Sequence, residues 1–252
     1  MKEKINNFFL GVKNLDREKR KSILMAICLV AGLIIVSFFT PIYDVEDIIV
    51  EGNDSVSEKT ISDASGINYG ESIFKVSIPD VKKRLSKVAF VDSAKVRYVL
   101  PDRIKIVVKE RQESAYISFI GNYIGIDDTG KILEVKQKAE DVSKPIVYGL
   151  SIENFEIGST IYTENEKGKN ILYNILKQIS INDIGDRIKF IDVNDDDNIR
   201  LTLSNDIEVK LGSLDNIKYK MAYLKSIIEE IKDVNGGVVD ITDTENVTYR
   251  AK

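Results

Sequence analysis

A long uncharged stretch lies near the start of the chain. No charged side chain occurs between Ser22 and Tyr43, and residues 23–39 are almost wholly apolar. The 21 residues from 23 to 43 come close to the ~20 that a helix needs to cross a ~30 Å hydrocarbon core. A buried globular helix is the alternative, but such a helix rarely lacks a polar face over roughly five turns. The pattern therefore predicts a membrane-spanning helix at residues 23–43.

Residues 44–112 predict a small domain in which two helices cover one face of a three-stranded sheet. Gly52 is suited to a turn with positive φ, and Ser55 with Glu58 has the spacing of a capping box at a helix start. Period-two alternation on both sides of a Pro101-Asp102 turn indicates a hairpin. The expected order is β-α-α-β-β, with strands at 45–51, 93–100 and 103–109 and helices at 56–64 and 77–87.

Residues 113–252 predict a larger domain of mixed character, which places the chain in the α+β class. Gly121-Asn122 is typical of a hairpin turn, and 145–148 has the length of a short edge strand. Two segments have helical spacing of apolar residues, 171–181 and 216–234. The expected strands are 116–120, 123–126, 132–135, 145–148, 188–193, 199–203, 207–211, 238–241 and 247–250.

Charge then gives the apolar stretch a direction. Residues 1–22 hold seven Lys and Arg against three acids, whereas residues 41–252 hold 29 basic and 37 acidic side chains. Because basic flanks stay on the cytoplasmic side, residues 1–22 are expected to form a cytoplasmic tail and residues 44–252 to lie outside the membrane. This is the single-pass type II arrangement.

Cleavage of the apolar stretch is the competing interpretation. A signal peptidase needs small residues at the cut, but the run ends in Phe38-Phe39. A lipoprotein needs its cysteine after a complete apolar stretch, and Cys28 lies only six residues into this one. An uncleaved anchor is therefore expected.

The composition excludes several classes of chemistry. With no His and a single Cys, the chain can build neither a Cys/His zinc site, nor a His-dependent nucleophile, nor a disulfide framework. A net charge of −4 and a pI of about 5.2 argue against nucleic-acid binding. These absences favour a binding protein over an enzyme.

Two weaker chemical signals also fail. Residues 192–198 resemble part of an EF-hand loop, but Asp197 stands where that loop needs Gly and Leu203 where it needs Glu. A solvated acidic turn is the better interpretation. A membrane-anchored Ser/Lys hydrolase would need no His, yet no recognised motif frames a nucleophilic serine. We therefore predict no catalytic residue, no metal and no cofactor.

Several short runs, in a consistent order and spacing, are similar to one known family. They are Glu51-Gly52-Asn53, Ala94 to Arg97, Glu110-Arg111, Ile126 to Gly130, Leu211-Gly212 with Lys220, and Gly237 to Ile241. Together they resemble the bacterial cell-division proteins FtsQ and, in Gram-positive organisms, DivIB. The chain departs from the family at Thr242, where Arg is common.

The resemblance implies a POTRA domain at 44–112 and a β domain at 113–252. It also implies a non-enzymatic divisome scaffold, concentrated in the cell membrane at the division septum. Members of the family bind two single-span division proteins, FtsL and DivIC (also called FtsB). Through them they help to assemble or control the septal peptidoglycan synthase pair, FtsW with a transpeptidase.

The family holds its partner largely at the last strands of the β domain. A final strand pair after Gly236-Gly237 is expected at a sheet edge, where unpaired backbone groups can accept a partner strand. The alternative function is an export or folding factor that binds substrate strands at the POTRA sheet. The residues expected to contact the partner are Val239, Ile241, Asp243, Val247 and Tyr249.

Overall fold

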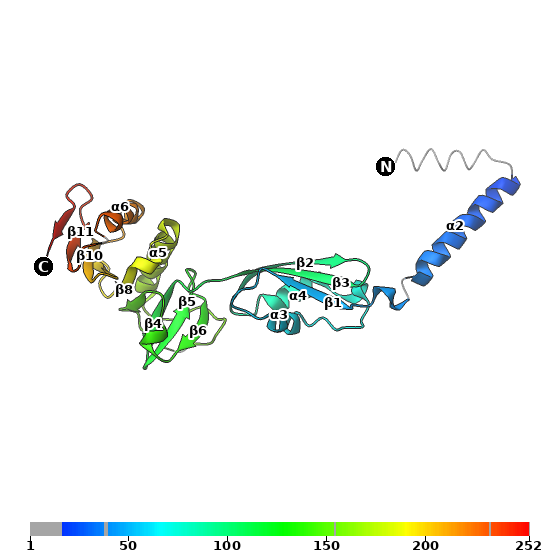
Figure 1. Ribbon diagram of the computed structural model, residues 1–252, viewed down its shortest axis with the longest axis horizontal. Coiled ribbons are helices and arrows are strands. Elements are labelled where there is room, and N and C mark those ends of the chain that lie inside the picture. Colours follow the sequence, from blue (N-terminus) through cyan, green and yellow to red (C-terminus); the bar gives the residue numbers. More distant parts are fainter. Residues whose placement is uncertain (1–16, 38–39, 154, 232, 252) are drawn as a thin grey trace.

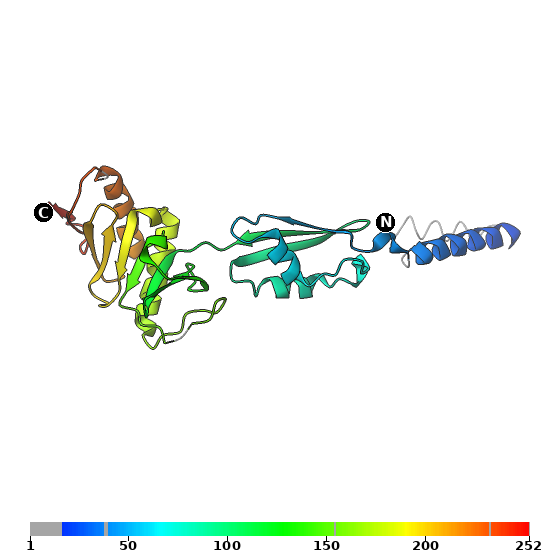
Figure 2. The ribbon, with the colours of Figure 1, turned by 60° about the horizontal axis from the view of Figure 1, so that its bottom comes forward.

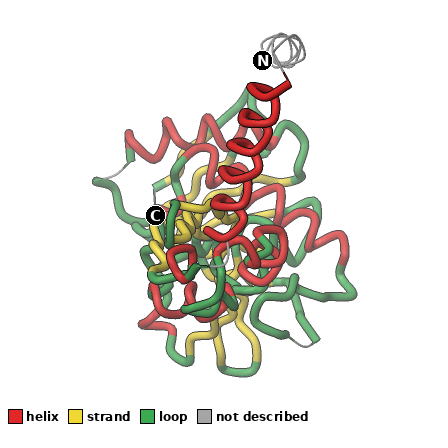
Figure 3. Tube along the Cα trace, turned by 90° about the vertical axis from the view of Figure 1, so that its right-hand side faces the viewer, coloured by secondary structure: helices red, strands yellow, loops and turns green. Residues whose placement is uncertain are grey.

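The molecule is an elongated row of three parts. The computed structural model describes residues 17–37, 40–153, 155–231 and 233–251. Helix α2 (Arg17–Ser37), a three-stranded domain and a nine-stranded domain follow one another, so the C-terminus lies at the end remote from α2 (Figures 1 and 2). Viewed along this row, the two domains overlap behind α2 (Figure 3). We call them the proximal and the distal domain.

The predicted span and tail are only partly described. Residues 1–16 of the expected tail and residues 38–39 of the expected span lie outside the described residues. In the rest of the expected span, α2 ends at Ser37, and residues 41–43 form the 3-10 turn η1 instead of continuing the helix. Within the described part of the chain, no helix is both long enough and apolar enough to cross a membrane.

The proximal domain has the predicted order β-α-α-β-β. Strand β3 lies in the centre of the sheet, parallel to β1 and antiparallel to β2. Ile61 from α3, with Val81 and Leu85 from α4, packs against Ile104 and Ile106 of β3. The elements are η1 (Pro41–Tyr43), β1 (Asp47–Glu51), α3 (Glu58–Ser65), η2 (Ile73–Lys75), α4 (Ile78–Leu85), β2 (Val91–Val99) and β3 (Arg103–Glu110).

The helix after the first turn begins two residues later than its capping box predicts. Ser57, not Ser55, is the N-cap, and its Oγ accepts a hydrogen bond from the Thr60 N–H. The Ser55 N–H is already bound, because it donates to the carboxylate of Glu110 at 2.8 Å. A contact distant in sequence therefore decides where α3 starts.

The distal domain is a nine-stranded sheet whose inner face is covered by two helices. The strand order is β12-β11-β10-β9-β8-β7-β4-β5-β6. Helices α5 and α6 contact each other, and their apolar residues share one core with the strands. The elements are β4 (Ala115–Phe119), β5 (Asn122–Ile126), β6 (Ile132–Lys136), η3 (Ala139–Asp141), β7 (Ile146–Tyr148), α5 (Glu166–Asn182), η4 (Gly185–Arg187), β8 (Ile188–Asp192), β9 (Ile199–Leu203), β10 (Ile207–Gly212), α6 (Ile217–Glu230), β11 (Gly237–Asp240) and β12 (Thr248–Arg250).

One strand lies elsewhere than predicted. The expectation of an edge strand at 145–148 is wrong, because β7 lies between β8 and β4 and runs parallel to both. Val147 is buried in the core. Three residues suffice in the middle of the sheet because longer neighbours supply the hydrogen bonds on both sides.

The two ends of the large sheet are finished differently. At β6, Ile132 exchanges backbone hydrogen bonds with Gly158 and Ser159, and Lys131 pairs with Thr160, so a loop pairs with the start of this edge strand. At the other end, β12 has a strand on one side only. Natural sheets usually protect their edges, so the open edge at β12 is a candidate site for pairing with another chain.

Glu110, at the end of β3, holds the turn that joins β1 to α3. Its carboxylate accepts hydrogen bonds from the backbone N–H groups of Asp54 (3.1 Å), Ser55 (2.8 Å) and Val56 (3.0 Å). Burial acts to raise the pKa of Glu110, but these three donors together lower the pKa below its ordinary value. The charged carboxylate is therefore the form that fits the folded state.

We predict that Glu110→Gln weakens the proximal domain above pH ~4.5, and that the effect fades as the pH falls below this value. A carboxyl group with a lowered folded-state pKa contributes stability above its unfolded pKa, and this contribution disappears as the pH falls through the folded pKa. Urea unfolding followed by circular dichroism across this range measures the effect. Glu58→Gln, at an exposed position on α3, is the control. Parallel pH profiles for Glu110→Gln and the parent chain would contradict the assignment.

Candidate docking edge and the junction that positions it

Strand β12 is the open end of the nine-stranded sheet. It pairs antiparallel with β11 through Val238 opposite Arg250, Val239 opposite Tyr249 and Asp240 opposite Thr248. On its other side β12 has no strand in the described part of the chain. In Figure 1 this edge lies at the end of the molecule remote from α2.

The direction of the backbone groups on β12 follows from the neighbouring strands. The Ile241 N–H donates to the Lys210 carbonyl at 2.9 Å. The backbone N–H and C=O groups of Val239 and Ile241 therefore point toward β10, and those of Val238 and Asp240 point toward β12. Backbone groups alternate along a strand. The N–H and C=O of Tyr249, which lies opposite Val239, therefore point outward from the sheet.

The five predicted contact residues lie together, but at different depths. Val239 and Ile241 are buried in the core, so their side chains support the edge from beneath instead of forming its surface. Val247 is partly buried against the same core. Asp243 is exposed, and Tyr249 is 41% exposed. Only Asp243, Val247 and Tyr249 thus present side-chain surface beside the outward backbone groups.

Asp243 orders the connection between β11 and β12. Its carboxylate accepts hydrogen bonds from the Asn246 side chain (2.8 Å) and the Glu245 N–H (2.9 Å). These two donors lower the pKa of Asp243, the Asn246 contact being the larger cause. The tight turn keeps the short β12 close to β11.

Tyr249 fits the edge because residue 237 is glycine. Gly237 has φ +115°, and a Cβ there would lie 2.7 Å from the Arg250 carbonyl oxygen and 2.8 Å from the Tyr249 ring. The Tyr249 hydroxyl donates to the Gly236 carbonyl at 3.1 Å. The Tyr249 ring and the backbone of β12 can pack against β11 only because residue 237 has no side chain in this space.

Lys220 supports the edge and is not among the predicted contact residues. It is buried on α6, and its Nζ donates to the carbonyls of Leu211 (2.7 Å) and Ser213 (3.1 Å) at the end of β10. Burial lowers the pKa of Lys220, and Asp215 opposes this effect. A lysine next to the apolar positions of a helix was the sequence signal for a buried, backbone-bonded role.

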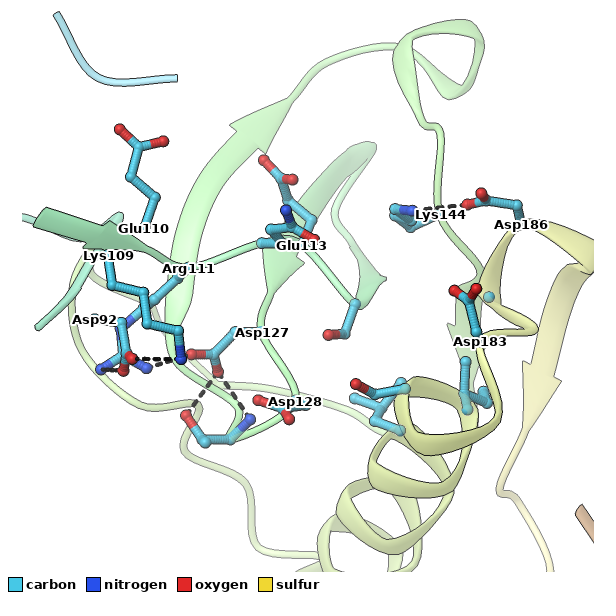
Figure 4. A pocket seen from close by; sticks show the side chains of 17 residues that line it. Asp92, Lys109, Glu110, Arg111, Glu113, Asp127, Asp128, Lys144, Asp183 and Asp186 are labelled. Carbon is cyan, nitrogen blue, oxygen red and sulfur yellow. Dashed lines mark hydrogen bonds and ion pairs between the residues drawn. The ribbon is translucent and has the colours of Figure 1, made fainter. Parts of the chain in front are cut away.

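A salt bridge joins the distal domain to the proximal one. Arg111 follows β3, and its Nη1 contacts the Asp127 carboxylate at 2.6 Å while its Nη2 contacts Asp92 of β2 at 3.3 Å. Asp127 is buried and also accepts hydrogen bonds from Thr129 and Lys131. Figure 4 shows Arg111 between the two acids.

Beside this salt bridge lies a cleft of about 620 Å³. Its labelled side chains come from both domains (Figure 4), and Lys144 forms an ion pair with Asp186 across 2.7 Å. The hydrogen bond from Lys144 lowers the pKa of Asp186. Among the described residues no group of three or more acids gathers as a metal site. Because its lining residues come from both domains, the cleft belongs to the junction between them.

Comparisons with known proteins agree with this architecture. Residues 44–111 match the family described as "POTRA domain, FtsQ-type", and residues 115–243 match "Cell division protein FtsQ/DivIB, C-terminal". The chain belongs to the FtsQ/DivIB family of cell division proteins. The proximal domain is thus its POTRA domain.

Individual relatives cover most of the chain. A "Cell division protein DivIB" of Clostridium botulinum (strain Loch Maree / Type A3) is 25% identical over 96% of this chain and 94% of its own length. The DivIB of Bacillus subtilis (strain 168) is 28% identical over 86% and 77%. A "Cell division protein FtsQ" of Syntrophotalea carbinolica is 26% identical over 90% and 78%. The FtsQ/DivIB match ends at residue 243, before β12.

We predict that Gly237→Ala loosens β12. The added Cβ collides with the Arg250 carbonyl and the Tyr249 ring, so the amides of Thr248 and Arg250, which face β11, should exchange at least about tenfold faster. Hydrogen exchange followed by NMR measures this. Gly236→Ala is the matched control, because Gly236 also has positive φ but no atom lies within 4 Å of its added Cβ. Equal effects of the two substitutions would disprove the steric explanation.

We predict that Arg111→Met destabilises the junction by about 3–5 kcal/mol, because Asp127 is then left buried and unpaired. Lys109→Met is the control: Lys109 contacts Asp92 at 3.2 Å but is 77% exposed, so its loss should cost less than about 1 kcal/mol. Urea unfolding gives both values. Indistinguishable midpoints for the two variants would show that the salt bridge does not hold the domains.

Proposed function

We propose that this protein is a non-enzymatic divisome scaffold that binds single-span division proteins of the FtsL and DivIC/FtsB type through the edge at β12. By holding them it helps to assemble, stabilise or control the septal peptidoglycan synthesis complex of FtsW and its transpeptidase. The observation that carries this proposal is the edge strand β12, which has no strand on its outer side in the described part of the chain, in a member of a cell-division family.

The physical basis is addition of a partner strand. The outward N–H and C=O of Tyr249 offer main-chain hydrogen bonds, which give affinity without sequence preference. Specificity then comes from side chains on either side of the new strand. Val247 and Tyr249 share the face of Val239, whereas Thr248 and Arg250 lie on the opposite face. A fitting partner strand is therefore apolar on one face and polar on the other.

We also propose that residues 23–43 anchor the protein in the cell membrane, with the N-terminus in the cytoplasm and the two domains outside. Support comes from the sequence: a stretch without charge, a basic segment before it and an acidic segment after it. Leu24, Met25, Leu29 and Val30 of α2 are exposed, as lipid-facing residues would be. Recruitment by the partners would concentrate the anchored protein at the division septum.

A second candidate function is an export or folding factor that binds substrate strands at the POTRA sheet. The observation that favours it is strand β2, nine residues long, which is an edge of the proximal sheet. This function requires binding at the β2 edge of the proximal sheet and gives β12 no part in binding. The two proposals therefore predict opposite results for a substitution in β12.

The test compares two substitutions at one position. Tyr249→Pro removes the outward N–H, whereas Tyr249→Thr removes the same ring but keeps the N–H. We expect Tyr249→Pro to weaken co-purification of the full chain with its FtsL-like and DivIC-like partners at least about tenfold more than Tyr249→Thr does, because one or two main-chain hydrogen bonds are lost.

Circular dichroism and unfolding midpoints check that both variants fold alike. Retained partner binding by Tyr249→Pro would contradict docking at β12. Loss of the midcell band of a fluorescent fusion carrying Tyr249→Pro, with the band kept by Tyr249→Thr, would link the same edge to recruitment in dividing cells.

A further inference from the structure

The exposed apolar side chains of the proximal domain are concentrated at one end of it. Between residues 40 and 111, which are all described, five large apolar side chains are exposed: Ile42 (61%), Tyr69 (63%), Phe74 (45%), Tyr98 (38%) and Leu100 (61%). All five lie on η1, on the loop through η2, or on the end of β2 and the turn that follows it. We call this group the apolar tip.

Hydrogen bonds hold these three segments together. The Val45 N–H donates to the Glu71 carbonyl at 2.8 Å, and the Glu46 N–H donates to the Asp102 carbonyl at 2.8 Å. The hydroxyl of Tyr98 donates to the Val76 carbonyl at 2.7 Å. The apolar tip is therefore a surface held by the fold and not a set of loose loops.

Aromatic packing adds to this rigidity. The rings of Tyr43 and Phe74 lie 5.2 Å apart between centroids. Each of these residues comes from a different segment of the tip, since Tyr43 ends η1 and Phe74 lies in η2. Aromatic side chains held in this way can meet an apolar medium without first losing conformational freedom.

The position of the tip indicates what covers it. Figures 1 and 2 show η1 leading from α2 into the end of the proximal domain, so the apolar tip faces α2. Exposed apolar residues of α2, among them Leu29 and Val36, precede Ile42 in the chain. Tyr beside a membrane span is typical of the interfacial layer, where its ring is partly buried and its hydroxyl stays in contact with water.

The charges around the tip indicate whether apolar burial or electrostatic attraction would hold it to a bilayer. Asp44, Glu71 and Asp102 belong to the same segments as the tip, with Lys75 and Arg103 as the nearby cations. Because these charged groups have no net positive charge, they do not attract anionic lipids. Contact with a bilayer would thus depend on apolar burial, and would persist at high salt and in zwitterionic lipid.

We propose that the apolar tip lies in the headgroup layer of the bilayer that the anchor crosses. This inference rests on the membrane anchor proposed above. The lipid contact holds the proximal domain by a second point besides α2, and so limits how far the domain can tilt. Through the Arg111–Asp127 junction it also limits where the edge at β12 stands above the membrane.

The test uses the full chain in phosphatidylcholine vesicles that contain nitroxide-labelled lipid. Cys28→Ser removes the single thiol, and single cysteines for a fluorescent label are then placed at Leu100 on the tip, at Ser93 near the far end of β2, and at Val36 on α2. We expect nitroxide quenching of the Leu100→Cys label to exceed that of the Ser93→Cys label at least about twofold, because six residues of strand rise ~20 Å.

The Val36→Cys label separates failure of the anchor from failure of the tip. Quenching at Val36 with equal, weak quenching at Leu100 and Ser93 would overturn the tip proposal and leave the anchor intact. Weak quenching at Val36 would overturn both. Shielding of the Leu100 label from aqueous iodide without quenching by lipid would show a protein cover, and would also overturn the proposal.

Substitutions and lipid composition test the apolar mechanism. Tyr69→Ser with Phe74→Ser should reduce quenching of the Leu100 label, and Tyr219→Ser, at an exposed tyrosine of the distal domain, should not. Quenching should be unchanged by phosphatidylglycerol or by salt. An increase with phosphatidylglycerol that salt abolishes would identify electrostatic adsorption and contradict the proposal.

Discussion

Every backbone N–H and C=O in a sheet needs a hydrogen-bond partner, and β12 is where the distal domain leaves this requirement open. At the opposite end the chain itself satisfies part of this requirement, through the loop that pairs with Ile132 at the start of β6. The rest of the distal domain keeps the open edge in place: Gly237 leaves room for Tyr249, and Lys220 binds the end of β10. Under the proposed function, another chain supplies the strand that completes the sheet.

The elongated shape gives that edge a defined position. Helix α2, the POTRA domain and the nine-stranded domain lie in a row, and the buried Arg111–Asp127 salt bridge fixes the joint between the two domains. Without this joint the edge could sample many positions relative to the proximal domain. The scaffold role proposed above requires the opposite, a restricted reach and orientation of the edge.

Much of the fold could be predicted because its signals are local. The alternation of apolar and polar residues predicted the bounds of β9 (Ile199–Leu203) and predicted those of β3 to within one residue. The predicted order of the POTRA elements is confirmed. One difference comes from a contact distant in sequence, and another is a local shift of a turn by one residue. The N–H of Ser55 is bound by Glu110, so α3 starts at a later cap. The hairpin turn predicted at Gly121-Asn122 lies one residue earlier, with positive φ at Ile120 and Gly121.

The sequence proposes the last strands as the candidate site but does not give the depth of each residue. Val239 and Ile241 are buried in the core that the strands share with α6, and this burial depends on tertiary packing. The most direct measurement is the hydrogen-exchange rate of the Tyr249 amide in the full chain, with and without its bound partners. Docking at the edge predicts that this outward N–H exchanges readily in the free protein and becomes strongly protected in the complex. An unchanged rate at Tyr249 in a saturated complex would contradict the account.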